Sequence, residues 1–126
     1  HFNLNNKVNI INPTNKLKNF YMKSHLFVIP SLWEGFPNSL AEAMSYGIPS
    51  IGFKSCDGVN QLINDTNGWL VEGKNNAENL AKIMHIAIKD NQIRHLKGLK
   101  AKEDIKKFNF DEILNLWTKL VNKDEL

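Results

Sequence analysis

The chain has 126 residues, of which 42% are hydrophobic and 23% are charged, as is typical of a soluble globular chain with one domain. Its single cysteine, Cys56, excludes an internal disulfide framework, and no apolar run approaches the ~18 residues that span a bilayer. The formal net charge of +3 permits contact with an anionic membrane surface or a phosphorylated ligand but demands neither.

The predicted elements begin after a polar N-terminal stretch. The β-branched run at residues 8–11 predicts a short strand. Turn residues follow it, and residues 16–24 carry apolar side chains at helical spacing. The continuous apolar run at residues 26–29 ends at Pro30 and predicts a strand that is buried on both faces.

The middle of the chain alternates between helix and strand signals. A turn at residues 31–38 leads into a predicted helix at residues 39–46, which Gly47 is expected to end in a left-handed cap. Strands are predicted at residues 49–53 and 69–71, with a short helix at residues 59–64 between them.

The pattern becomes helical after Gly73. Residues 77–88 carry an apolar stripe on one helix face, and residues 93–107 predict a lysine-rich helix. Asp111 is expected to cap a last helix. The apolar inner face of that helix comprises Ile113, Leu114, Trp117, Leu120 and Val121.

Alternating strands and helices predict an α/β fold, a Rossmann-like doubly wound parallel sheet followed by C-terminal helices. Such sheets bind ligands beyond the carboxyl ends of their strands. The turn after Ile29 lies at such an end, so the topology places Glu34 and the start of the next helix at the expected ligand site.

That turn has the chemistry of an anion site. The backbone N–H groups of Asn38, Ser39 and Leu40 occupy the first turn of the helix, where amides lack partners and attract a diphosphate. Gly35 lets the backbone come close to a ligand. Pro37 has no N–H to donate, but it stiffens the turn.

Two carboxylates, Glu34 and Glu42, bracket the turn with seven residues between them. Carboxylates accept hydrogen bonds from hydroxyl groups, so Glu34 suits a hexose and Glu42 a ribose. An alternative stays open for each. Ser39 and Glu42 also form a capping-box pattern, and Glu34 alone fits a solvated loop residue.

The stretch Pro30-Ser-Leu-Trp-Glu-Gly-Phe-Pro-Asn-Ser-Leu-Ala-Glu-Ala-Met-Ser-Tyr-Gly-Ile-Pro closely resembles the signature of the retaining, GT-B-fold glycosyltransferases called group 1. The resemblance implies that Glu34 contacts the donor sugar as the catalytic-site carboxylate and that Glu42 contacts the ribose. It also implies that the residues between them line the sugar and phosphates: Gly35, Phe36, Pro37, Asn38, Ser39 and Leu40. Position 37 departs from the pattern, because the family usually has a small residue where this chain has proline.

The resemblance also implies the domain organisation. Residues 1–108 would form a partial donor-binding domain, the C-terminal half of a GT-B fold without its first strands. Residues 109–126 would form a helix that packs back towards an N-terminal domain. By analogy the sheet order would be 3-2-1-4-5-6, with residues 8–11 as the third strand. We therefore expect a fragment that is inactive alone.

The implied function is a hexosyltransferase-type glycosyltransferase that uses a nucleotide-diphosphate sugar, expected to be a UDP-sugar, in polysaccharide, lipopolysaccharide or glycolipid synthesis. No Asp-x-Asp motif is present, so neither a metal nor a cofactor is expected. The acceptor would be a saccharide or a lipid-linked molecule, not a nucleic acid. The expected location is cytoplasmic, with peripheral contact at the inner membrane face. Two alternatives are a non-catalytic nucleotide-sugar-binding module and a GT-B nucleotide-sugar epimerase.

Other features favour plain structural roles. Trp33 and Trp69 are expected to serve in packing rather than as stacking platforms, although Trp33 adjoins the site. A basic stretch predicts a solvated face, with a membrane-surface patch as the alternative, and consists of Lys97, Lys100, Lys102, Lys106 and Lys107. The last four residues, 123–126, match an endoplasmic-reticulum retention motif, which we interpret as coincidence.

Overall fold

The computed structural model describes Leu4 and residues 7–122. Three short strands, β1 (Phe27–Ile29), β2 (Ser50–Phe53) and β3 (Gly68–Val71), form a parallel sheet in the order β1-β2-β3. The register pairs Ile51 of β2 with Val28 on one side and with Trp69 on the other. A helix connects each strand to the next, as parallel pairing requires. The predicted α/β class with a parallel sheet is confirmed.

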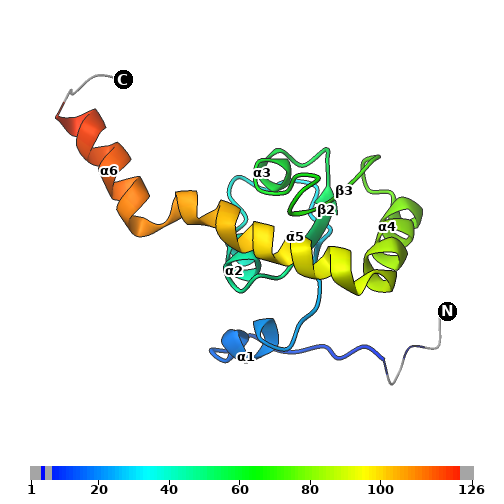
Figure 1. Cartoon of the computed structure of the whole chain (residues 1–126). Coiled ribbons are helices and arrows are strands. Elements are labelled where there is room, and N and C mark those ends of the chain that lie inside the picture. The colour runs from blue at the N-terminus through cyan, green and yellow to red at the C-terminus, as the bar shows by residue number, and fades with distance from the viewer. Residues whose placement is uncertain (1–3, 5–6, 123–126) are drawn as a thin grey trace.

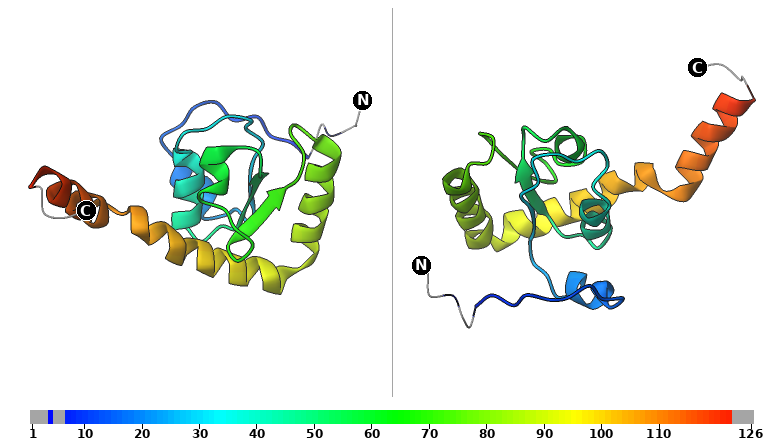
Figure 2. Two further views of the ribbon diagram at one scale, coloured as in Figure 1. Left: turned by 90° about the horizontal axis from the view of Figure 1, so that it is seen from above. Right: turned by 180° about the vertical axis from the view of Figure 1, so that it is seen from behind.

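Helices cover both faces of the sheet (Figures 1 and 2). On one face lie α2 (Asn38–Ser45), α3 (Asp57–Asn60) and α5 (Asn91–Asp104), and on the other lies α4 (Ala77–Lys89). The first face buries a core that includes Ile29, Leu40, Met44, Val59 and Ile63. The second buries Ile51, Phe53, Val71 and Ala87. Because successive residues of β2 point to opposite faces, this strand contributes to both layers.

The predicted strand at residues 8–11 is wrong. These residues form no strand, and the side chain of Ile10 is 95% exposed. A strand needs a hydrogen-bonding neighbour, and within the described residues β1 pairs with β2 alone. The strand β1 was predicted to be buried on both faces, but Val28 is only half-buried. The helix α4 packs mainly over β2 and β3 and so covers β1 less.

The predicted helices exist with shifted ends. The helix α1 (Leu17–Tyr21) is shorter than predicted, and α2 and α3 begin one and two residues earlier than expected. The left-handed cap at Gly47 is confirmed by its φ of +74°.

At the C-terminal end, α5 continues into the 3₁₀ helix η1 (Ile105–Phe108) and then α6 (Phe110–Val121). Asn109, rather than Asp111, caps α6, because its side-chain oxygen accepts the Glu112 N–H at 2.8 Å. Figure 1 shows α6 extending away from the rest of the fold. Its apolar face is exposed, with Trp117 60% accessible, and its packing against a further domain stays a prediction.

Over the described part of the chain, no helix combines the length and apolar character that crossing a bilayer requires. The C-terminal retention-like motif at residues 123–126 lies outside the described residues.

Candidate functional site

The loop between β1 and α2 lies at the carboxyl edge of the sheet and is anchored to the start of α3. The Gly58 N–H donates a hydrogen bond to the Glu34 carbonyl at 3.2 Å. A Cβ at position 58 would stand only 2.4 Å from the carbonyl oxygens of Glu34 and Gly35. Position 58 therefore requires glycine for this close approach. The sequence did not indicate this contact between Gly58 and the loop.

The next part of the loop is open to solvent. Glu34 is half-buried and Gly35 is exposed. In the described structure no atom lies within 4 Å of a Cβ built on Gly35, and its φ is not left-handed. Gly35 is therefore required neither by packing nor by its backbone conformation, and its surroundings leave space for a ligand.

The first turn of α2 leaves two amides available. Pro37 is the N-cap, and its carbonyl accepts the N–H groups of Leu40 at 3.0 Å and Ala41 at 3.1 Å. The Leu40 side chain is fully buried in the core. Within the described residues the N–H groups of Asn38 and Ser39 have no acceptor. Of the three amides expected to face a phosphate, these two remain free to do so.

Glu42 has a partner that the sequence did not indicate. The capping-box alternative is wrong, because α2 begins at Asn38 and no side chain of the described structure caps it. Instead, the Tyr21 hydroxyl donates to Glu42 Oε2 at 3.0 Å. No hydrogen bond to Glu42 Oε1 is present among the described residues. One carboxylate oxygen is thus oriented by Tyr21, and the other is available to a ligand.

Tyr21 is itself held by aromatic packing. Its ring stacks on that of Tyr46, with centroids 5.4 Å apart and an interplanar angle of 16°. Burial, and then the hydrogen bond to Glu42, raise the pKa of Tyr21 to about 12. Tyr21 therefore remains a hydrogen-bond donor to the carboxylate at neutral pH.

A groove of about 550 Å³ runs between α2 and the end of α5 with η1. Three of the predicted site residues line it: Phe36, Asn38 and Glu42. Its other wall includes Lys102, Ile105, Lys106 and Phe108. The rings of Phe36 and Phe108 meet edge to face at 5.2 Å, so η1 closes the groove at the start of α2. The sequence placed no residue of this second wall near the site.

Trp33 does not pack in the core, so that expectation was wrong. The side chain is 78% exposed, and the Lys74 ammonium lies 4.3 Å from its ring centroid. Trp69 does pack as expected, partly buried against the core beneath α4. The two tryptophans differ because Trp69 belongs to a strand between two layers, whereas Trp33 lies in a loop at the sheet edge.

The basic stretch is partly used within the domain. Lys97 donates to the carbonyl oxygens of Asp65 and Gly68, and Lys100 pairs with Glu103 and Asp104 at 3.0 Å each. These contacts remove two of the five lysines from any membrane-facing patch, which leaves Lys102, Lys106 and Lys107.

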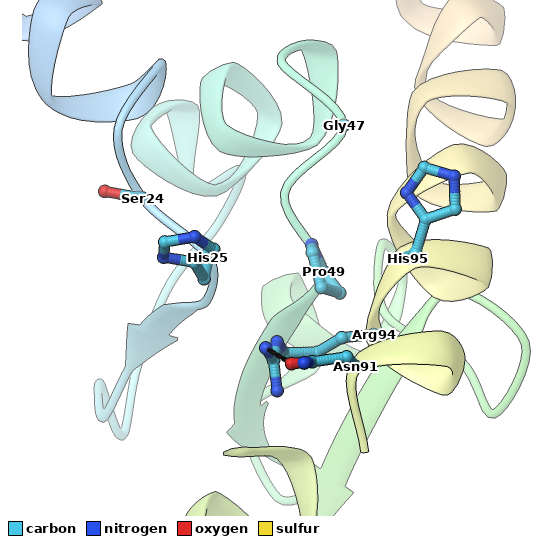
Figure 3. A pocket seen from close by; sticks show the side chains of 7 residues that line it. All are labelled: Ser24, His25, Gly47, Pro49, Asn91, Arg94 and His95. Carbon is cyan, nitrogen blue, oxygen red and sulfur yellow. Dashed lines mark hydrogen bonds between the residues drawn. The ribbon is translucent and has the colours of Figure 1, made fainter. Parts of the chain in front are cut away.

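A second pocket, of about 410 Å³, opens at the amino edge of the sheet (Figure 3). His25 and Pro49, just before β1 and β2, face Arg94 and His95 of α5 across it. Arg94 donates to the carbonyls of Ala87 at 2.8 Å and Ile88 at 2.6 Å, so its guanidinium caps the end of α4. This pocket lies at the opposite end of the strands from Glu34 and is not part of the candidate site.

Metal binding has no candidate cluster in the described part of the chain, where no three His, Cys, Asp or Glu side chains gather. The expectation that the chemistry needs no metal stays a prediction.

Comparison with known proteins adds to this geometry. Residues 1–106 match the family model described as glycosyl transferases group 1. An uncharacterized glycosyltransferase of Haemophilus influenzae is 30% identical over 90% of this chain and 32% of its own length. A UDP-Gal:α-D-GlcNAc-diphosphoundecaprenol α-1,3-galactosyltransferase of Escherichia coli is 38% identical over 56% of this chain and 18% of its own.

Among solved structures, the sucrose-phosphate synthase of Thermosynechococcus elongatus matches with a TM-score of 0.76 and 25% identity. The match covers 86% of this chain and 27% of the synthase. The chain thus spans about a third or less of the length of the relatives that it matches.

Proposed function

The chain belongs to the group 1 glycosyltransferase family, and we propose that it supplies the donor-binding part of a retaining, metal-independent hexosyltransferase. The donor would be a nucleotide-diphosphate sugar, most simply a UDP-sugar. In this proposal the chain is the C-terminal half of a GT-B fold, and α6 packs on an N-terminal domain that binds the acceptor.

One observation carries the proposal: two unpaired amides begin a helix at the carboxyl edge of the sheet, and a carboxylate residue stands on either side of them in the chain. The N–H groups of Asn38 and Ser39 lack acceptors within the described residues. The uncapped start of α2 adds a partial positive charge. Glu34 precedes these amides in an open loop, and Glu42 follows them one turn later. Along a nucleotide sugar, the hexose hydroxyls need hydrogen-bond acceptors, the diphosphate oxygens need donors, and the ribose hydroxyls again need acceptors. Glu34, the two amides and Glu42 follow one another in the chain in the same order.

The same arrangement suggests how the chain would assist glycosyl transfer. When the bond between the anomeric carbon and the diphosphate oxygen breaks, negative charge grows on the leaving diphosphate. The amides of Asn38 and Ser39 are fixed by the helix and would stabilise that charge. Glu34 would orient the sugar, while Tyr21 holds Glu42 ready for the ribose.

The family context supports a proposal for the acceptor and for the location. The Escherichia coli relative is named for transfer to a diphosphoundecaprenol-linked sugar. We propose a lipid-linked or saccharide acceptor for this protein too, in envelope polysaccharide or glycolipid synthesis. It would act in the cytoplasm, with Lys102, Lys106 and Lys107 available for peripheral contact with the inner membrane face.

Calorimetric titration of the chain with UDP and with UDP-galactose tests the donor site. The variant Glu42→Gln should weaken UDP binding about tenfold, because it loses a charge-assisted hydrogen bond to the ribose. Glu34→Gln should weaken UDP-galactose binding but leave UDP binding unchanged. Glu112→Gln, an exposed carboxylate on α6, is the matched control. Equal UDP affinity in the wild type and Glu42→Gln, or no UDP binding by the wild type, would contradict the proposal.

A further inference from the structure

The pocket at the amino edge of the sheet brings together side chains from two distant parts of the chain. His25 belongs to the segment just before β1, and Arg94 and His95 belong to the first two turns of α5. Figure 3 shows the Arg94 side chain reaching from α5 toward the segment that carries His25. The pocket has a volume of about 410 Å³, and none of the described residues that line it is acidic. A hollow of this size and composition suits a small anion.

The guanidinium of Arg94 is fixed in place and keeps unused donors. Arg94 is the one arginine among the 16 basic residues of the chain, and it is half-buried. Its Nη1 donates to the carbonyls of Ala87 and Ile88, and its Nη2 donates to Asn91 Oδ1. A guanidinium has five N–H groups, so the Nε–H and one Nη2–H are left without an acceptor among the described residues. Nε and Nη2 form one edge of the guanidinium, the fork that binds two oxygens of a phosphate or carboxylate.

The charge of Arg94 has no acidic partner. In the described structure no ion pair includes this side chain. Asp90 stands four residues earlier, but its carboxylate accepts the Ile93 N–H at 2.9 Å as the N-cap of α5. The carbonyls at the end of α4 contribute only about half a negative charge. The pocket therefore carries a net positive charge even when both histidines are neutral.

We propose that this pocket binds a phosphate group, with two of its oxygens on the Arg94 fork and the others on the imidazoles of His25 and His95. A carboxylate has only two oxygens, whereas a phosphate presents oxygens to donors on both sides of a pocket. The site lies at the opposite edge of the sheet from Glu34, so it is separate from the proposed donor site and does not depend on it. A soluble phosphate monoester and a lipid headgroup both carry this chemistry.

The test uses the full 126-residue chain, ¹⁵N-labelled, with inorganic phosphate as the probe at constant ionic strength. Because the chain has one arginine, a single Nε–H resonance reports on the pocket without further assignment. We expect phosphate to move this resonance until the site is saturated. Acetate, which has two oxygens, should need about tenfold higher concentration for the same shift.

The histidine variants test the other wall of the pocket. His25→Ala and His95→Ala should each weaken phosphate binding about fivefold, because each removes one hydrogen bond to the anion. His85→Ala is the matched control, since His85 is an exposed histidine of α4 outside the pocket, and it should leave the affinity unchanged.

Arg94→Lys keeps the positive charge but loses the fork, so it should weaken phosphate binding more than either histidine variant does. Calorimetric titration measures this affinity, because the variant has no arginine resonance. Arg94 also caps α4, so circular dichroism checks that the variant is folded. The two histidine variants keep the test decisive if it is not.

Two further probes separate the sources of the phosphate. Glycerol 3-phosphate represents a soluble monoester, and phosphatidylcholine vesicles that contain phosphatidic acid represent a lipid headgroup. Binding of glycerol 3-phosphate that weakens in His25→Ala assigns the pocket to a soluble ligand. Vesicle binding that weakens in the same variant, and that is absent with phosphatidylcholine alone, assigns it to a membrane lipid.

The inference fails if phosphate leaves the Arg94 resonance in place, or if chloride moves it equally. It also fails if His85→Ala weakens binding as much as His25→Ala does, because the effect would then reflect overall charge. A phosphate response confined to the amides of Asn38 and Ser39 overturns this site and supports the donor site. A response of Arg94 without any UDP response at those amides supports this site and contradicts the donor proposal.

Discussion

At the residue scale, Glu42 depends on Tyr21, a side chain 21 positions earlier in the chain. The folded state holds the Tyr21 phenol neutral and raises its pKa to about 12, above the ~10 of an unfolded chain. The unfolded chain therefore loses this proton first. The stability that the phenol contributes is complete below about pH 10 and is lost as the pH rises through about 12.

Tyr21→Phe should therefore remove part of the alkaline loss of stability. Urea unfolding followed by circular dichroism, below pH 10 and near pH 12, measures it. The wild type should lose more unfolding free energy over this interval than the variant does. Equal losses would show that Tyr21 does not titrate as the fold requires.

Gly58 anchors the loop that carries Glu34. Gly58→Ala should lower the free energy of unfolding by about 1–3 kcal/mol, because the new methyl group would overlap the Glu34 and Gly35 carbonyls. Urea denaturation measures this loss, and UDP-galactose binding should weaken with it. A variant as stable as the wild type would show that the loop is not held at Gly58.

Gly35 gives the complementary prediction. Gly35→Ala should change stability by no more than about 0.5 kcal/mol, because in the described structure its Cβ would meet no atom within 4 Å. UDP-galactose affinity should nevertheless fall, since the methyl group occupies space that we assign to the ligand. Unfolding and titration of the same sample separate the two effects. Unchanged affinity would place the sugar away from this backbone.

At the element scale, the helices begin in two different ways. The caps of α4, α5 and α6 are Asn76, Asp90 and Asn109, and each accepts the N–H three residues later. The N-cap of α2 is Pro37, whose side chain accepts nothing. In α4, α5 and α6 a side-chain cap accepts one of the N-terminal backbone N–H groups, whereas α2 has no such cap. The unpaired N–H groups at the start of α2 are the groups that would bind an anion.

The C-terminal helix makes a second prediction at this scale. Its apolar face is exposed, so the double variant Trp117→Gln, Leu120→Gln should alter the unfolding free energy by no more than about 0.5 kcal/mol. The wild type should self-associate more than the variant, because the exposed apolar face of α6 has no partner in the described structure. Sedimentation velocity measures the association. A large loss of stability would mean that α6 packs on its own domain.

At the scale of the whole molecule, a polar contact joins α5 to the loop before β3. The buried Asn67 donates to Asp104 Oδ2 at 2.9 Å, and Lys100 pairs with the same carboxylate. Burial alone would raise the pKa of Asp104, but the hydrogen bonds from Lys100 and Asn67 outweigh it and lower the pKa below its usual value. A lowered carboxyl pKa contributes stability above the unfolded value that is lost as the pH falls through the folded value.

Asp104→Asn should therefore cost about 1 kcal/mol at pH 7 and much less in acid, where the wild-type carboxyl is protonated too. Urea midpoints at neutral pH and below the unfolded Asp pKa measure the difference. Glu103→Gln, which removes an exposed neighbour, is the control. A cost that is the same at both pH values would show that the charge of Asp104 does not stabilise the fold.

The sequence by itself determined those features whose causes lie within one short segment. Hydrophobic period, turn residues and helix signals predicted the parallel α/β sheet, the position of α2 after strand β1 and the left-handed Gly47. The same local pattern placed Glu34 and Glu42 on either side of a helix start.

Only the tertiary structure decided which distant residues meet. In the part of the chain that the structure describes, residues 8–11 have strand composition but no neighbouring strand to pair with, and Trp33 is apolar but has no layer above it. The contacts of Tyr21 with Glu42 and of Gly58 with the Glu34 loop join segments far apart in the chain. Burial and hydrogen-bond partners depend on residues that are close in space but distant in the sequence. The hydrophobic period of a single segment carries no information about those residues.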